Sequence, residues 1–327
     1  CTSETEKEMR SLFAFTLVLF LAGNGLAQQM PSLPKGTKWP KNFRELQETY
    51  KKQGIEIKRA VVKPAPGTSR KLDLVYTQRG DRKLKLDLFL PKTSTKPAPI
   101  LVFIHGGGWR KGNRIGEHAK AIWFANRGWI TAAIEYRLAD EARFPAAIHD
   151  CKDSIRWTRA NARKYNGDPH RIAVCGGSAG AHLAALVATA GPKAGLEGTH
   201  GEKGSSAVQA AIVIAGPTDT AGERAAEQSR REDSNYRLFL GGTIDEVPTM
   251  YTRASPAHWV SGETPPMLII GEHSIKPAGL ILKKLKANRI PNETFVLTGG
   301  IHGEWNWGPW FAITMNRAEL FLRQHLK

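Results

Sequence analysis

Ile172-Ala-Val-Cys-Gly-Gly-Ser-Ala-Gly-Ala-His-Leu-Ala184 is the stretch of sequence that decides the fold. An apolar run leads into Gly176-Gly177-Ser178-Ala179-Gly180, a G-x-S-x-G pattern, and an alanine-rich run follows it. This order predicts a strand, a tight turn and a helix, with the hydroxyl of Ser178 projecting above the sheet edge at the helix N-terminus. The pattern by itself also fits a plain glycine-rich turn, so the interpretation depends on further motifs.

A second motif, Pro99-Ile-Leu-Val-Phe-Ile-His-Gly-Gly-Gly-Trp109, is an apolar strand that runs into three glycines. Glycines after a strand let backbone N–H groups approach a developing oxyanion. We expect the N–H groups of Gly106, Gly107 and Ala179 to form an oxyanion hole. Because this motif precedes the serine turn by some seventy residues, the two together favour a nucleophilic serine.

These motifs resemble the α/β-hydrolases of the HGGG esterase group. The chain is similar to hormone-sensitive-lipase-like carboxylesterases, and more closely to the secreted acetylxylan or feruloyl esterase type, over most of residues 72–327. The agreeing segments are Tyr136-Arg-Leu-Ala139, Phe144-Pro-Ala-Ala-Ile148, Asp168-Pro-His-Arg-Ile172, Gly216-Pro-Thr-Asp219, Ala254-Ser-Pro256 and Pro265-Pro-Met-Leu-Ile-Ile270. The resemblance implies a serine esterase, but a fold alone does not establish function, so the site residues carry the argument.

The catalytic base is expected after the last strand. A β-branched, apolar run, Glu293-Thr-Phe-Val-Leu-Thr298, leads to Gly299-Gly300-Ile301-His302-Gly303, which resembles the family's loop with the catalytic histidine. This position, and the chain order of serine before histidine, indicate His302 among the ten histidines. His105 and His182 lie inside the other two motifs, where the family uses them structurally.

The catalytic acid is where the sequence departs from the family pattern. Relatives carry an Asp in a Gly-Glu-x-Asp turn after the penultimate core strand, whereas this chain reads Gly271-Glu272-His273-Ser274. A serine cannot hold the charge that stabilises an imidazolium, so Ser274 is not the acid. Strand alternation leaves open whether Glu272 faces the right side of the sheet. The alternatives are Glu272, which we favour, Asp219, Glu304, or a triad without a functional acid.

Apolar periodicity predicts the remaining elements. Segments 72–78 and 83–90 alternate and are expected to pair antiparallel at the sheet edge. Other strands are expected at 100–105, 129–136, 171–175, 209–215, 267–270 and 293–298, and helices at 115–127, 145–165, 179–190, 276–288 and 311–325. This alternation predicts an α/β fold, a three-layer α/β/α sandwich with a mostly parallel eight-stranded sheet.

The chain is expected to have three parts. Residues 1–27 are interpreted as an upstream extension plus a secretory signal peptide, because Met9-Arg10 precedes a short apolar run and Gly25-Leu-Ala27 fits a cleavage site. Residues 28–71 are expected to wrap the surface of a hydrolase domain at 72–327. The insertion at about 218–263 reads as a partial lid or as a solvated loop. The signal-like segment within residues 1–27 predicts a secreted or periplasmic protein.

The composition limits the classes of partner and cofactor that the protein is expected to bind. The formal net charge is +17, but the Lys and Arg residues are dispersed, so nucleic-acid binding is not expected. Attraction to an anionic matrix or membrane surface suits an exported hydrolase better. Cys151 and Cys175 are expected to be buried free thiols, although a bridge is open in an oxidising compartment. The sequence has no metal-spacing motif or phosphate loop, so neither metal nor organic cofactor is expected.

The expected activity is hydrolysis of short-chain acyl or aromatic esters, with acyl groups on plant-type polysaccharide as the target that the resemblance implies. Trp109 and Trp305 lie near the catalytic loops in sequence and could stack on a sugar ring or an aromatic acyl group. One alternative is a catalytically weak or silent descendant that binds carbohydrate or protein. It is motivated by Ser274 and by Ala181, where relatives usually have Gly. A lipase or peptidase of the same fold is a lesser alternative.

Overall fold

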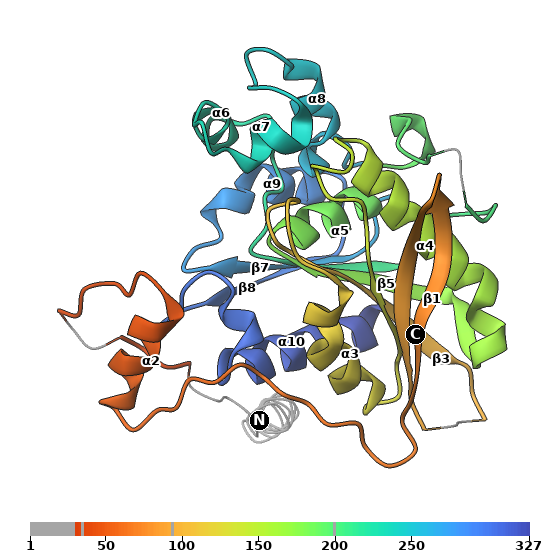
Figure 1. Cartoon of the computed structure of the whole chain (residues 1–327), viewed down its shortest axis with the longest axis horizontal. Helices are drawn as coiled ribbons and strands as arrows, with labels where there is room; N and C mark the ends of the chain where they lie inside the picture. The colour runs from red at the N-terminus through yellow and green to blue at the C-terminus, as the bar shows by residue number, and fades with distance from the viewer. Residues whose placement is uncertain (1–29, 34–35, 93–94, 199–200) are drawn as a thin grey trace, which may run out of the picture.

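The computed structural model describes residues 30–33, 36–92, 95–198 and 201–327. Its centre is an eight-stranded sheet in the order β1-β2-β4-β3-β5-β6-β7-β8 (Figure 1). β1 pairs antiparallel with β2 and β2 with β4, and the other neighbours are parallel. The predicted secretory segment, residues 1–27, lies outside the described residues.

The elements follow the predicted alternation. The strands are β1 Ser69–Arg79, β2 Arg82–Leu90, β3 Ala98–Ile104, β4 Ile130–Ile134, β5 Gly167–Gly177, β6 Ala210–Ile214, β7 Met267–Glu272 and β8 Asn292–Leu297. The helices are α2 Phe43–Lys51, α3 His118–Ala125, α4 Ala146–Asn161, α5 Ala179–Thr189, α6 Glu223–Ser229, α7 Asn235–Leu240, α8 Pro248–Arg253, α9 Gly279–Ala287 and α10 Trp310–His325. The predicted α/β-hydrolase sandwich is confirmed.

The sheet is buried on both faces because successive side chains of a strand point to opposite sides. In β3, Ile100, Val102 and Ile104 join one core cluster, whereas Leu101 and Phe103 join the other. The first cluster, under α4, α5 and α9, is called the α5 face here, and the second, under α3 and α10, the α10 face. This arrangement makes the three layers of the sandwich.

The two described cysteines belong to different layers. Cys151 lies on α4 in the core of the α5 face, and Cys175 lies on β5 with its side chain in the core of the α10 face. Both are free and buried. The sheet separates them, which excludes a bridge between the two.

The N-terminal segment before β1 contacts the loop that follows β8. Residues 58–60 pair with residues 306–308 through backbone bonds from Ala60 N–H to Asn306 O (2.9 Å) and from Gly308 N–H to Lys58 O (2.8 Å). The ring of Phe43, on α2, stacks on Trp307 with ring centroids 4.3 Å apart. Segments from opposite ends of the chain therefore lie side by side, as Figure 1 shows for α2 and α10.

The insertion at 218–263 is ordered as three short helices, α6, α7 and α8, above the α5 face of the sheet (Figure 1). Aromatic contacts anchor it, since Phe239 of α7 is buried and its ring lies on Trp109. Among the described residues, no helix has the length and apolar character needed to span a bilayer.

Candidate active site

Ser178 lies at the turn between β5 and α5, as the G-x-S-x-G pattern predicts. Its backbone adopts φ 57° and ψ −123°, a strained conformation that non-glycine residues rarely adopt. The flanking glycines make this turn sterically feasible, because a Cβ at Gly176 would collide with Gly180 O and a Cβ at Gly180 with Ile104 O. The Ser178 N–H donates to Ile214 O of β6 at 2.8 Å, which ties the turn to the sheet.

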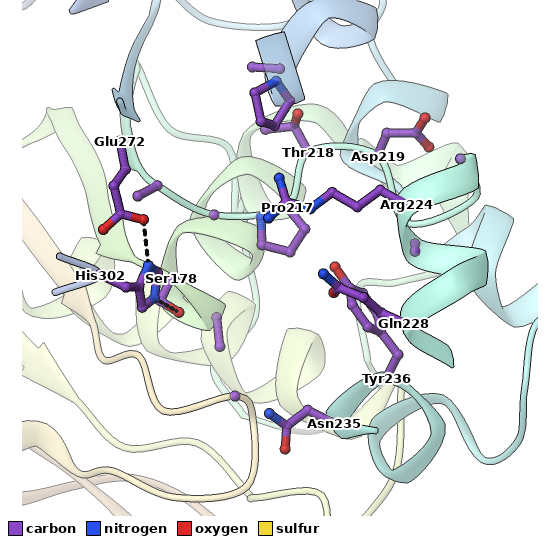
Figure 2. Close-up of a pocket in the computed structure, with 18 of the residues that line it drawn as sticks. Ser178, Pro217, Thr218, Asp219, Arg224, Gln228, Asn235, Tyr236, Glu272 and His302 are labelled. Carbon is purple, nitrogen blue, oxygen red and sulfur yellow. Dashed lines mark hydrogen bonds and ion pairs between the residues drawn. The ribbon is translucent and has the colours of Figure 1, made fainter. Parts of the chain in front are cut away.

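His302 joins the serine to a carboxylate. Its Nε2 lies 2.9 Å from Ser178 Oγ, and its Nδ1 lies 2.9 Å from Glu272 Oε2. A carboxylate can only accept, so His302 Nδ1–H donates to Glu272 and Nε2 is left to accept from the serine hydroxyl. Figure 2 shows the three side chains in this order at one end of the cavity. The structure thus brings together the predicted nucleophile, base and favoured acid.

Glu272 reaches the histidine because of its strand parity. It has the parity of Leu268 and Ile270 in β7, whose side chains face the α10 side of the sheet, where the His302 loop packs. Asp219, another candidate acid, and Ser274, at the position where the resemblance implies an Asp, have different partners. Asp219 Oδ1 accepts from Ala221 N–H and Ser255 Oγ, and Ser274 Oγ accepts from Lys276 N–H. Ser274 therefore serves a local turn, and Asp219 links its own turn to Ser255.

The loop after β8 is held by the N-terminal segment. Tyr50 of α2 donates its hydroxyl to Gly299 O at 2.7 Å, and burial together with the nearby Glu304 carboxyl raises the Tyr50 pKa to about 12. Gly299 has φ +84°, and a Cβ there would collide with Pro31 O. The backbone that presents His302 is therefore held by residues that precede the sheet.

Glu304, the third candidate for the acid, makes no hydrogen bond or ion pair with His302 among the described residues and is buried in the loop after β8. Its side chain has no exposed surface and neither carboxyl oxygen has a hydrogen-bond partner among the described residues. Burial and the charge of Glu272 raise the Glu304 pKa to about 8. A carboxylic acid is therefore held protonated at neutral pH beside the triad.

The glycine turn at 106–108 lies beside Ser178. Gly106 packs against Ser178, since a Cβ there would lie 3.3 Å from the serine Cβ, and Gly107 O accepts from the N–H groups of Arg110 and Lys111. Neither lines the cavity, whereas Gly108 and Ala179 do. The assignment of Gly106, Gly107 and Ala179 as oxyanion donors stays a prediction.

The two tryptophans predicted to bind substrate are buried. Trp109 is 4% and Trp305 3% exposed. Trp109 borders the cavity, but its ring stacks on Phe239 and its Nε1–H donates to His182 Nδ1 at 3.2 Å. Trp305 packs beneath Gly177 with its ring edge-on to His302. These indoles support the catalytic loops and offer little surface for a substrate ring, contrary to the prediction.

His182 and His105 are structural in this fold. Burial lowers the His182 pKa to about 4, so the ring is neutral, donating from Nε2 to Ala254 O and accepting from Trp109. The His105 ring stacks on Tyr136, and its Nδ1–H donates to Gly106 O at 2.8 Å. Both rings hold the turns around Ser178 in place.

A cavity of about 620 Å³ opens beside Ser178 and His302. The insertion at 218–263 supplies the wall opposite the triad, and Figure 2 shows its polar side chains across from Ser178. Among them are Asp219, Arg224, Gln228, Asn235 and Tyr236. The wall can donate and accept hydrogen bonds. Within the described residues, no group of three or more His, Cys, Asp or Glu side chains is placed to hold a metal ion.

Comparison with known proteins places this geometry in a family. The BD-FAE family profile matches residues 86–274, which is more than half of the chain. Esterase LipC of Mycobacterium tuberculosis is 38% identical over 177 residues, which are 54% of this chain and 44% of LipC. The chain thus spans less than half the length of this curated relative.

Solved esterase structures have the same fold. An esterase of Thermogutta terrifontis, solved with propionate bound, superposes with a TM-score of 0.65 and 27% identity over 79% of this chain and 94% of that one. The same esterase has been solved with butyrate bound. A bifunctional GH43-CE protein of Bacteroides eggerthii gives a TM-score of 0.68 and 27% identity over 79% of this chain and 35% of that one. The chain belongs to the BD-FAE family and has the α/β-hydrolase fold of these esterases.

Proposed function

We propose that this protein is a serine carboxylesterase that hydrolyses short-chain acyl esters. The observation that carries the proposal is the pair of 2.9 Å contacts that connect Ser178 Oγ, His302 and Glu272 in series at the edge of a solvent-accessible cavity. A serine hydroxyl is a weak nucleophile until an oriented base removes its proton. The histidine and its carboxylate partner meet this requirement.

The reaction proceeds in two halves. Ser178 Oγ attacks the ester carbonyl carbon while its proton moves to His302 Nε2, and Glu272 stabilises the imidazolium. The tetrahedral intermediate collapses as His302 gives the proton to the leaving alkoxide, which departs as the alcohol. A water molecule then attacks the acyl-enzyme with His302 again as base. The second tetrahedral intermediate then collapses: its bond to Ser178 Oγ breaks, the carboxylic acid is released, and His302 returns the proton to Ser178.

The developing oxyanion needs fixed donors. The glycine turn at 106–108 and the N terminus of α5 flank Ser178, and Gly108 and Ala179 border the cavity. We assign the backbone N–H groups of this turn and of Ala179 as the donors. Removing one such donor in serine hydrolases costs roughly 100-fold to 1000-fold in kcat.

The wall of the cavity favours a short acyl group and a polar alcohol. Arg224, Gln228 and Asn235 face the triad across the cavity (Figure 2) and suit hydroxyl-bearing groups better than a long alkyl chain. The propionate and butyrate complexes of the related esterase support a short acyl group. An acylated polysaccharide is therefore the proposed natural substrate class, and export to the periplasm or medium is proposed from residues 9–27.

A panel of p-nitrophenyl esters tests the activity. We expect turnover to be highest with acetyl to butyryl esters and to fall with longer chains, and Ser178→Ala to lose at least roughly 1000-fold in kcat. Ala carries a Cβ as Ser does and meets the same positive φ at this turn, so the fold should be kept, and circular dichroism of the variant serves as the folding control. Equal turnover by both proteins would remove the nucleophile assignment, and no turnover by either would support the silent-cleft alternative.

A further inference from the structure

Behind the triad lies a buried acid that the esterase mechanism does not use. Glu304 starts the turn after Gly303 and has no exposed surface. Its carboxyl group lies against Gly300, where a Cβ would collide with Oε2. The Gly300 N–H is close by but makes no hydrogen bond of good geometry with it. A buried, unpaired carboxylate is costly, so the environment favours the neutral acid.

The groups around Glu304 do not offset a negative charge. The titratable groups that face it are Glu272, at the end of β7, and Tyr50, on α2. One carboxyl oxygen of Glu272 also lacks a hydrogen bond: Oε1 is buried without a partner, whereas Oε2 accepts from His302 Nδ1–H. No Lys, Arg or His of the described residues forms an ion pair with Glu304. Ionising Glu304 would therefore place two carboxylates together in a site of low dielectric.

We propose that Glu304 holds a proton in the active enzyme and thereby keeps a second negative charge away from the Glu272–His302 pair. The inference rests on the proposed function and makes Glu304 a positioning residue, which does not touch the substrate. Ionised Glu304 would repel Glu272, and the strain would be relieved by moving either Glu272 or the 299–304 loop. Either movement lengthens the contact between Glu272 Oε2 and His302 Nδ1.

The pH dependence of kcat/KM separates this role from a structural one. For the wild type we expect kcat/KM to fall by at least roughly threefold above pH 8, where Glu304 ionises. Glu304→Gln mimics the protonated acid, so it should keep kcat/KM near the wild-type value at pH 7 and remove the alkaline fall. Glu48→Gln, an exposed change on α2, is the matched control and should leave the whole profile unchanged.

Two outcomes contradict the proposal. Parallel profiles of the wild type and Glu304→Gln up to pH 9.5 would show that the protonation state of Glu304 does not matter to the site. The second test does not need activity: infrared difference spectra of the wild type should contain a protonated carboxyl C=O band at pH 7 that disappears by pH 9.5. Absence of that band would overturn the proposal even if Glu304→Gln fails to fold. Presence of the band in a protein without esterase turnover would contradict only the proposed function.

Discussion

At the scale of single residues, the carboxylate that contacts His302 lies earlier in the chain than the family resemblance implies. The relatives' pattern puts the acid two residues after the strand end, where this chain has Ser274, and the structure puts Glu272 on the strand itself beside His302. Glutamate has one more methylene than aspartate and can project from the strand end toward the histidine loop. The chain therefore keeps a carboxylate on the imidazole although the position of the usual Asp is occupied by Ser.

Glu272→Gln should lower kcat by roughly 100-fold to 10,000-fold at neutral pH, because an amide cannot offset the imidazolium and can favour the wrong tautomer. Asp219→Asn is the control, since an asparagine oxygen can still accept from Ala221 N–H and Ser255 Oγ. We expect the kcat of Asp219→Asn to stay within about threefold of the wild-type value. Steady-state kinetics with one short-chain ester decide between the two carboxylates. An unimpaired Glu272→Gln would refute the acid assignment.

Glu304 should also make stability depend on pH. Its pKa is raised from the ordinary value of 4.5 to about 8 in the folded protein. Below pH 4.5 both states hold the proton and no penalty arises. Between pH 4.5 and 8 the unfolded chain releases the proton that the folded chain retains, so the free energy of unfolding falls as pH rises, by about 1.4 kcal/mol per unit at most. The loss is complete above pH 8.

Urea unfolding at pH 5 and pH 8.5 measures this effect. Because Glu304→Gln cannot ionise, its stability relative to wild type should increase between the two values by an amount on the order of a few kcal/mol. Comparing the variant with wild type at each pH cancels the other titrating groups. A constant difference would mean that Glu304 ionises normally in the folded protein.

At the scale of elements, the N-terminal segment belongs to the active site. Residues from α2 and from 58–60 hold the loop that carries His302, although they precede the first strand of the sheet. Tyr50→Phe removes the hydrogen bond to Gly299 O and leaves that carbonyl without its partner, at a cost of about 1–3 kcal/mol in the free energy of unfolding. Because this carbonyl lies three residues from His302, kcat should fall as well.

Tyr76→Phe is the matched control for this prediction. Its hydroxyl donates to Glu135 O at 2.6 Å at the other edge of the sheet, so the same chemistry is removed away from the triad. Both variants should lose stability in thermal unfolding, but only Tyr50→Phe should lose kcat measured well below its melting temperature. If both keep full kcat, the N-terminal segment contributes stability alone.

At the scale of the whole molecule, the sheet determines the chemistry of the cysteines. Cys151 and Cys175 lie on opposite faces. Burial raises the pKa of both thiols, that of Cys175 to about 12, so neither thiol is a reactive nucleophile. In the segment from Gln28 onward, a thiol reagent should label neither cysteine in the native protein and both cysteines after denaturation. Labelling should be the same with and without prior reduction. Release of thiols only after reduction would indicate an intermolecular bridge.

The sequence by itself determined the sheet, the serine turn and the histidine loop, because these depend on local patterns. Apolar alternation marks strands, and a nucleophile turn needs glycines at set distances from the serine. The expected strands and helices lie close to those observed, and Ser178 and His302 meet as the chain order predicts. These features can be predicted without knowing which residues pack against them.

Tertiary structure alone decided which carboxylate meets His302, which glycine borders the cavity and what the tryptophans do. The sequence favours Glu272 but leaves Asp219 and Glu304 open, and only the parity of β7 against the α10 face distinguishes them. Trp109 and Trp305 became packing residues because α7 and the serine turn cover them. Each of these outcomes depends on contacts between residues far apart in sequence, and local composition does not encode which of those contacts form.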